Sequence, residues 1–164
     1  MKSKFPERYA MLRTLIFCLS LSVLLTGCAA IDAMLSRLSC PLTEPLWIKP
    51  PEDSAVLDPP AYGYYFVNED RSIWASAGWT GQEEYRLRAS EEGIKMGWFR
   101  PAGIELVITG QRMDAQAPPL HSHAPCCYPT RFQATGLYFP TEGCWEVKAK
   151  AGDSELTFVV WVEP

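Results

Sequence analysis

The C-terminal sequence Trp145-Glu-Val-Lys-Ala-Lys-Ala-Gly-Asp-Ser-Glu-Leu-Thr-Phe-Val-Val-Trp-Val162 alternates apolar and polar side chains on both sides of a short turn. Before the turn, Trp145 and the apolar residues that follow it alternate with Glu and Lys. After the turn Ala151-Gly-Asp-Ser154, the apolar side chains from Leu156 to Val162 again fall at every second position. This period of two is typical of strands with one buried face, so the sequence predicts an antiparallel hairpin.

Short apolar segments separated by turn residues continue this pattern toward the N-terminus. We expect further strands at 62–67, 72–77, 94–100, 103–110 and 130–139. Asn68-Glu-Asp-Arg71 is a predicted turn between the first two, Ile104, Leu106 and Ile108 are expected to line one face, and Gly136 is a predicted β-bulge. The fold class is therefore all-β, an antiparallel β-sandwich of about seven strands.

The segment Phe139-Pro-Thr-Glu-Gly-Cys-Trp-Glu-Val147, followed by the hairpin, resembles the last two strands of immunoglobulin-like sandwiches. Residues 96–164 also resemble the C-terminal half of a group of uncharacterised secreted bacterial proteins with such a domain. The resemblance implies an immunoglobulin-like domain over 61–164 and no particular activity. Cys144 falls on the Glu/Lys face of its strand, which departs from the inter-sheet cysteine of antibody domains.

Residues 1–27 have the layout of a bacterial signal peptide. Lys2, Lys4, Arg8 and Arg13 precede the apolar run 15–25, which is too short to span a bilayer as a helix. The run ends in Leu25-Thr26-Gly27-Cys28, which resembles the lipobox of bacterial lipoproteins. Met11 is an alternative start.

The lipobox resemblance implies that the signal is removed and that Cys28 carries the lipid, including palmitate. Two or more acyl chains anchor a protein stably, so the membrane is an expected partner. Ala29 follows the cysteine, which implies the outer membrane in an organism that has one, and otherwise the outer face of the cell membrane.

The composition is that of a folded, exported chain. Of 164 residues, 48% are hydrophobic and 12% aromatic, which argues against disorder. Removing 1–27 leaves 11 basic and 18 acidic residues, a charge of −7. Nucleic acid is therefore an unexpected partner. Residues 28–60 are rich in proline and predict a lipid-anchored tether, with a short helix around Leu35 and a possible edge strand at Trp47 and Ile48.

Four cysteines remain as disulfide candidates after the signal leaves and Cys28 is acylated: Cys40, Cys126, Cys127 and Cys144. Three pairings are open: Cys126 with Cys127, or Cys40 and Cys144 each with one of these two. We favour a bridge from the Cys126/Cys127 pair to Cys144, since the intervening strand can turn back toward it.

Both histidines of the chain lie in His121-Ser-His-Ala-Pro-Cys-Cys127. In extended backbone His121 and His123 project to one side, and imidazole with the thiolates of Cys126 and Cys127 suits Zn²⁺ or Cu⁺. The competing interpretation is a proline-bounded surface loop with oxidised cysteines.

Enzyme signatures are missing from the sequence. It has no G-x-S-x-G, glycine-rich phosphate loop or H-E-x-x-H. The pairs Glu83-Glu84 and Glu91-Glu92 are interpreted as solvated charges, and Cys126 or Cys127 with His123 as a weak nucleophile candidate. A sugar-binding face of Trp74, Trp79 and Trp98 is a further hypothesis, against packing in the core.

The leading hypothesis is a non-catalytic envelope lipoprotein, with no cofactor, whose domain is an interaction or structural module. The alternative is a metal-binding lipoprotein that uses the loop from His121 to Cys127.

Overall fold

A computed structural model gives the structure of residues 35–51, 62–82 and 86–164, which are the residues described below. The chain divides into two units after Ser39, and the second unit, Cys40–Pro164, holds every strand of the described residues. In the first unit, residues 35–39 are helical, as expected, and Leu35 and Leu38 are exposed. The predicted signal peptide and Cys28 lie outside the described residues. Within the described part, no helix is long and apolar enough to cross a membrane.

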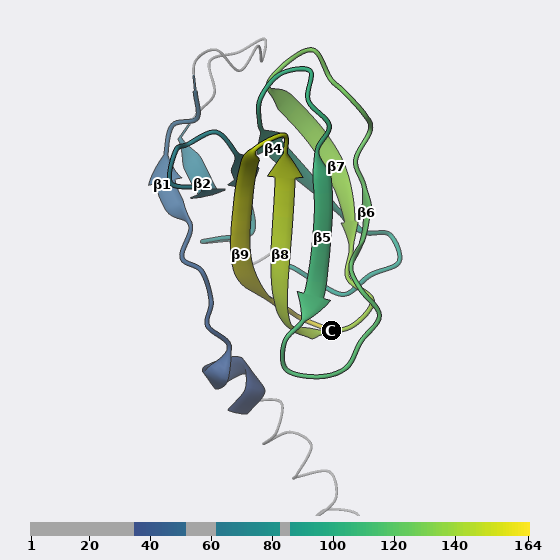
Figure 1. Cartoon of the computed structure of the whole chain (residues 1–164). Helices are drawn as coiled ribbons and strands as arrows, with labels where there is room; N and C mark the ends of the chain where they lie inside the picture. Colours follow the sequence, from purple (N-terminus) through teal and green to yellow (C-terminus); the bar gives the residue numbers. More distant parts are fainter. Residues whose placement is uncertain (1–34, 52–61, 83–85) are drawn as a thin grey trace, which may run out of the picture. The chain divides into compact units, whose positions relative to one another are not determined.

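Nine strands form two antiparallel sheets. They are β1 (Leu46–Ile48), β2 (Gly63–Val67), β3 (Trp74–Ser76), β4 (Ile94–Phe99), β5 (Val107–Arg112), β6 (His121–His123), β7 (Phe132–Tyr138), β8 (Gly143–Ala151) and β9 (Ser154–Val162). The larger sheet has the order β1-β2-β3-β4-β7-β6 and the smaller β5-β8-β9. The predicted all-β fold with two antiparallel sheets is confirmed, and Figure 1 shows the three-stranded sheet in front of the larger one.

The predicted C-terminal hairpin is confirmed as β8 and β9, which pair along their whole length from Gly143↔Val162 to Ala151↔Ser154. Its apolar positions are buried in the core, where Trp145 and Val147 are fully inaccessible. Phe158 of β9 stacks on Phe66 of β2 with 4.3 Å between ring centroids, so the two sheets face each other through this pair.

Two local predictions are wrong. The strand expected at 103–110 begins only at Val107, because Gly103 has φ of +71° and lies in a turn held by a hydrogen bond to the carbonyl of Tyr128. Of its expected inner face, Ile104 is therefore exposed while Leu106 and Ile108 are buried. Gly136 forms no bulge, since the β4–β7 register runs through it without a break.

Strand β6 lies inside the proline-rich segment that sequence analysis treated as a loop. The Ser122 hydroxyl donates a hydrogen bond to the Ile108 carbonyl, and the Leu120 N–H donates to Gly110, so this segment covers the edge of β5. On the other side of the small sheet, the Thr43 N–H donates to the carbonyl of Val159 in β9. Both edges of the small sheet are thus covered, which protects them from pairing with other chains.

The larger sheet extends past the smaller one at β1 and β2 (Figure 1). Tyr64 and Phe66 of β2 share one face because they are two residues apart, and Tyr62, directly before the strand, continues the same alternation. Tyr62 is exposed, Tyr64 is half-buried and Phe66 is buried against β9. The inner face of the sheet therefore emerges from the core into solvent over this short distance.

Candidate functional site

An exposed aromatic cluster lies on this overhanging face, which we call the aromatic groove (Trp47, Tyr62, Gly63, Tyr64, Gly78, Thr80, Gly81 and Gln82). The strand register places Trp47 opposite Tyr64, with 4.8 Å between their ring centroids. The Trp47 ring lies 6.4 Å from that of Tyr62, and the two planes are within 24° of each other. Trp47 and Tyr62 are 58% and 62% exposed. A contiguous exposed apolar patch of this kind is typical of a binding surface.

The turn at residues 77–82 forms the second wall of the groove. The Ala77 N–H donates to the carbonyl of Tyr64, and the Thr80 N–H donates to that of Ala77. Gly81 has φ of +77°, and a Cβ at this position would lie 3.4 Å from the Tyr64 ring. The positive φ favours glycine at this position, whereas the distance to the tyrosine ring is an ordinary van der Waals contact.

Together these residues enclose an open groove of about 530 Å³. This volume lies in the range of small-molecule sites. Among the described residues, the groove is lined by three aromatic residues, three glycines, Thr80 and Gln82, and none of these is an acid, a lysine, an arginine or a histidine. It can therefore stack against a flat apolar surface and form neutral hydrogen bonds.

The sugar-binding face hypothesised from the sequence involves other tryptophans, and the structure gives the competing interpretation for them, packing in the interior. Trp98 is fully buried and donates its indole N–H to the Thr135 hydroxyl. Trp74 is 4% exposed and donates to the carbonyl of Arg71. Trp79 packs against the core beside Phe66. Trp98 thus belongs to the core, Trp74 is buried beside Tyr65, and Trp79 is partly buried against the core. Trp47 was considered only as an edge-strand residue.

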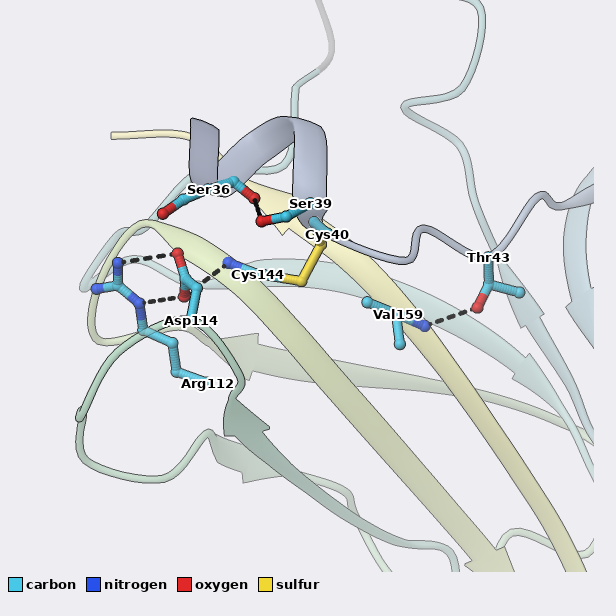
Figure 2. The surroundings of a disulfide bond; sticks show 8 residues. All are labelled: Ser36, Ser39, Cys40, Thr43, Arg112, Asp114, Cys144 and Val159. Carbon is cyan, nitrogen blue, oxygen red and sulfur yellow. Dashed lines mark hydrogen bonds and ion pairs between the residues drawn. A yellow bond between two sulfur atoms is a disulfide. The ribbon is translucent and has the colours of Figure 1, made fainter. Parts of the chain in front are cut away.

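A disulfide joins Cys40 to Cys144, with 5.7 Å between their Cα atoms and a sequence separation of 104. Figure 2 shows that it lies where the segment after Cys40 runs along β9, beside the hydrogen bond from the Val159 N–H to the Thr43 hydroxyl. The start of the domain is thereby fixed to β8 by a covalent bond and to β9 by hydrogen bonds.

The favoured pairing of Cys144 with Cys126 or Cys127 is wrong, because those two cysteines are joined to each other. The Trp145 side chain points into the core, so the side chain of its neighbour Cys144 points outward from β8. Cys144 therefore meets Cys40 on the outer face of the small sheet. The Cys126–Cys127 loop is instead held by residues of the larger sheet, as described below.

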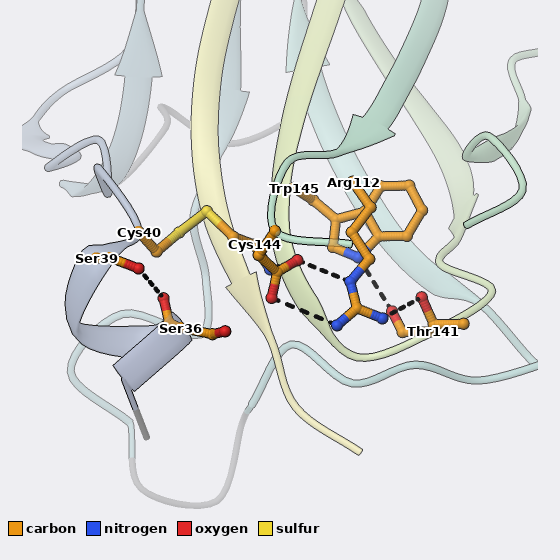
Figure 3. Close-up of polar contacts among 8 residues, drawn as sticks. Ser36, Ser39, Cys40, Arg112, Thr141, Cys144 and Trp145 are labelled. Carbon is orange, nitrogen blue, oxygen red and sulfur yellow. Dashed lines mark hydrogen bonds and ion pairs between the residues drawn. A yellow bond between two sulfur atoms is a disulfide. The ribbon is translucent and has the colours of Figure 1, made fainter. Parts of the chain in front are cut away.

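A polar network fixes the end of β8 beside the disulfide. The Arg112 guanidinium binds the Asp114 carboxylate at 2.7 Å, and the same carboxylate accepts the Cys144 N–H at 3.2 Å. Figure 3 shows Arg112 reaching the Thr141 hydroxyl as well, while the Trp145 indole donates to the Thr141 carbonyl. Burial opposes ionisation of Asp114, but the hydrogen bonds from Arg112 and Cys144 outweigh it and lower the pKa of Asp114.

This lowered pKa predicts how stability depends on acidity. A depressed pKa contributes stability above the ordinary aspartate pKa of about 3.9, and this contribution is lost as pH falls through the folded-state value. We expect Asp114→Asn to cost about 1 to 2 kcal/mol at neutral pH, with the difference from the parent shrinking below about pH 4. Denaturant unfolding at several pH values measures this. Asp153→Asn, in the exposed turn of the hairpin, is the control, and a deficit for Asp114→Asn that stays constant down to pH 2 would contradict the assignment.

The predicted metal site is only partly assembled. His121 and His123 lie on one face of β6, as the alternation predicts, and both are exposed. The His121 ring lies 5.1 Å from that of Tyr138, and His123 lines a hollow of about 320 Å³ beside Tyr138 and Lys95. The Cys126 and Cys127 thiols are in a disulfide, and the described residues contain no group of three or more potential metal ligands. The Zn²⁺ or Cu⁺ site stays a prediction.

A fully buried arginine holds the cysteine loop. Arg100 is inaccessible to solvent and donates to the Gln133 amide oxygen at 2.9 Å and to the Tyr128 and Pro101 carbonyls. The Gln133 amide in turn donates to the Pro125 carbonyl at 2.6 Å. Burial lowers the pKa of the Arg100 guanidinium. Residues 125–128 are therefore attached to the larger sheet by hydrogen bonds to Arg100, directly after β4, and to Gln133 of β7.

The enzyme candidates do not come together. Glu91 and Glu92 are exposed, Glu83 and Glu84 lie outside the described residues, and the cysteines that His123 was expected to activate are oxidised.

Comparisons with protein-family models, curated proteins and solved structures found no match to this chain. The aromatic groove is a candidate functional feature that sequence reasoning missed, although Tyr62, Tyr64 and Phe66 alternate visibly in the sequence.

Proposed function

We propose that this chain is a lipid-anchored, non-catalytic interaction or structural module of the bacterial cell envelope, on the outer face of the cell membrane where the organism has no outer membrane. Residues 1–27 would serve as the signal peptide and Cys28 would carry the lipid, in the outer membrane where the organism has one. The proposal rests on the basic, apolar and lipobox segments in sequence and on one observation in the structure, the Cys40–Cys144 disulfide.

Disulfides persist in oxidising compartments outside the cytoplasm, so this bond supports export of the chain. All four cysteines of the described residues are paired. The sequence has six cysteines, and the other two are Cys18, inside the proposed signal, and Cys28. Cys28 is then the free thiol left for acylation in the exported protein.

The position of the disulfide sets how far the domain can stand from the membrane. Cys40 follows Cys28 by 12 residues, a length of chain that spans at most about 40 Å when fully extended. The expected tether was residues 28–60, but the domain already begins at Cys40, and β1 then adds a strand to the larger sheet. The part of the tether that can extend between lipid and domain is therefore short. The interaction surface would lie close to the lipid.

The strand order supports an immunoglobulin-like sandwich as the scaffold. In constant-type immunoglobulin domains the strands A to G form sheets of order A-B-E-D and C-F-G. Strands β3 to β9, taken in sequence, have the orders β3-β4-β7-β6 and β5-β8-β9, which correspond strand for strand. Strands β1 and β2 would then be additions beside the first strand.

An interaction role is favoured over catalysis by the chemistry of the aromatic groove. Its exposed rings and neutral polar groups suit recognition, whereas general acid–base chemistry uses groups such as His, Glu or Lys, which do not occur among the described residues of its lining. The aromatic groove is also built on a sheet, a rigid support for a binding surface.

Replacing the proposed acylation site tests the anchor. In cells given labelled palmitate, we expect Cys28→Ala to incorporate no label and to retain its leader, because the thiol that is acylated before cleavage is missing. Cys18→Ala is the matched control and should be labelled and processed like the parent. Label that persists in Cys28→Ala would overturn the proposal.

A further inference from the structure

The aromatic groove has the chemistry of a carbohydrate site, and we propose that it binds a neutral, β-linked glycan. The inference deepens the proposed function by naming the ligand class, and it depends on the folded domain rather than on the lipid anchor. It rests on the exposed rings, the neutral polar groups beside them and the prolines that bracket β1.

The exposed rings supply the surface on which a sugar ring stacks. Trp47 and Tyr62 are more than half exposed although they touch each other and Tyr64. The face of an aromatic ring carries a negative quadrupole, so it attracts the C–H groups on the apolar side of a pyranose. β-Linked glucose and N-acetylglucosamine present such flat, C–H-rich faces.

The opposite wall supplies hydrogen bonds. The Gln82 amide and the Thr80 hydroxyl both donate and accept, and so match sugar hydroxyl and acetamido groups. Gly78 leaves the backbone of this wall open to close approach, since a Cβ there would meet only the Ser76 hydroxyl, at 3.8 Å. The combination of flat apolar rings with a few polar groups is what orients a small ligand in a site.

Charge selects among glycans. The described residues that line the groove carry no charge. The proposed exported chain, residues 28–164, carries 11 basic and 18 acidic residues, and this excess of negative charge repels anionic polysaccharides. A neutral glycan is therefore the fitting occupant.

A peptide added to the sheet is disfavoured at this edge. β1 is the outermost strand of the larger sheet and has only three residues. Pro45 precedes it, and Pro50 and Pro51 follow after Lys49. Proline has no N–H to donate, and short, proline-bounded edge strands resist pairing with another chain. A ligand at this edge would then be bound by the side chains of the aromatic groove and not by backbone pairing with β1.

Calorimetric titration tests the proposal on the full-length, acylated protein, kept in a detergent without a sugar head group. The probes are oligosaccharides of β-linked N-acetylglucosamine and of β-linked glucose. We expect at least one of them to bind, and Trp47→Ala and Tyr62→Ala each to weaken that binding about tenfold. Gln82→Ala, which leaves the rings in place, should weaken it as well.

Tyr128→Ala is the matched control, because Tyr128 is an exposed aromatic residue outside the groove. It should leave binding unchanged, and all variants should unfold at the temperature of the parent. Cys28→Ala should bind the sugar normally, which separates failure of the anchor from failure of the site. The proposal is overturned if neither oligosaccharide binds, or if binding survives Trp47→Ala and Tyr62→Ala undiminished, and a peptide ligand would then be the next candidate.

Discussion

Replacing Cys40 and Cys144 together by serine is expected to lower the free energy of unfolding by about 4 to 5 kcal/mol. The disulfide closes a loop of 104 residues, nearly the whole domain, and such a loop restricts the unfolded chain most strongly. The bond also holds the segment whose Thr43 covers the edge of β9. Denaturant unfolding followed by tryptophan fluorescence measures the loss.

The second disulfide is the natural control for the first. Cys126 and Cys127 are neighbours in sequence, so their bond closes almost no loop. The double serine variant at these positions should therefore lose much less stability than the variant at Cys40 and Cys144. Equal losses in the two double variants, or no loss in either, would contradict the view that the long disulfide clamps the fold.

Replacing Arg100 by methionine is expected to cost about 3 to 5 kcal/mol of stability. Methionine fills much of the same space but donates no hydrogen bonds. The Gln133 amide oxygen and the Tyr128 and Pro101 carbonyls would then lose their buried donor. The Tyr128 carbonyl keeps its hydrogen bond from the Gly103 N–H, but the Gln133 amide oxygen and the Pro101 carbonyl are left without this donor, and that loss outweighs the relief of removing one buried charge.

Hydrogen exchange locates the effect of the Arg100 variant. The amides around residues 125–128 should exchange faster, because this loop depends on Arg100 and Gln133 for its attachment. Arg88→Met, which removes an exposed arginine, is the control and should change neither stability nor exchange. A stable Arg100→Met variant with unchanged exchange would show that the buried network is dispensable.

The sequence was sufficient for the elements whose pattern is local. The β8–β9 hairpin could be predicted because its apolar residues alternate on both sides of a glycine-containing turn. The turn between β2 and β3 was equally visible, and in the structure the Asn68 side chain accepts the Ile73 N–H across it. In both cases neighbouring residues carry the information.

The remaining features depend on contacts between distant residues. Cys144 could be placed on the outer face of its strand, but its partner depends on where Cys40 returns to the domain. Strand β6 is only three residues long and forms because β7 pairs with it. Trp47 is exposed because the small sheet stops short of β1, a consequence of topology that no local pattern contains.

The proposed lipid, the disulfide and the aromatic groove combine into one account of the molecule. A lipid at Cys28 would bring the chain to the membrane, and Cys40 would fix the domain a short distance from it. β1, which begins six residues after Cys40, would present Trp47 to ligands in the same layer of the envelope. On this account each part of the N-terminal segment has a physical role.

The intact mass of the protein purified from its native envelope tests the lipoprotein assignment most directly. The account predicts a chain that begins at Cys28, is heavier than residues 28–164 by the attached acyl groups, and lacks the hydrogens removed by two disulfides. A chain that retains residues 1–27, or one that begins at Cys28 without lipid, would contradict it.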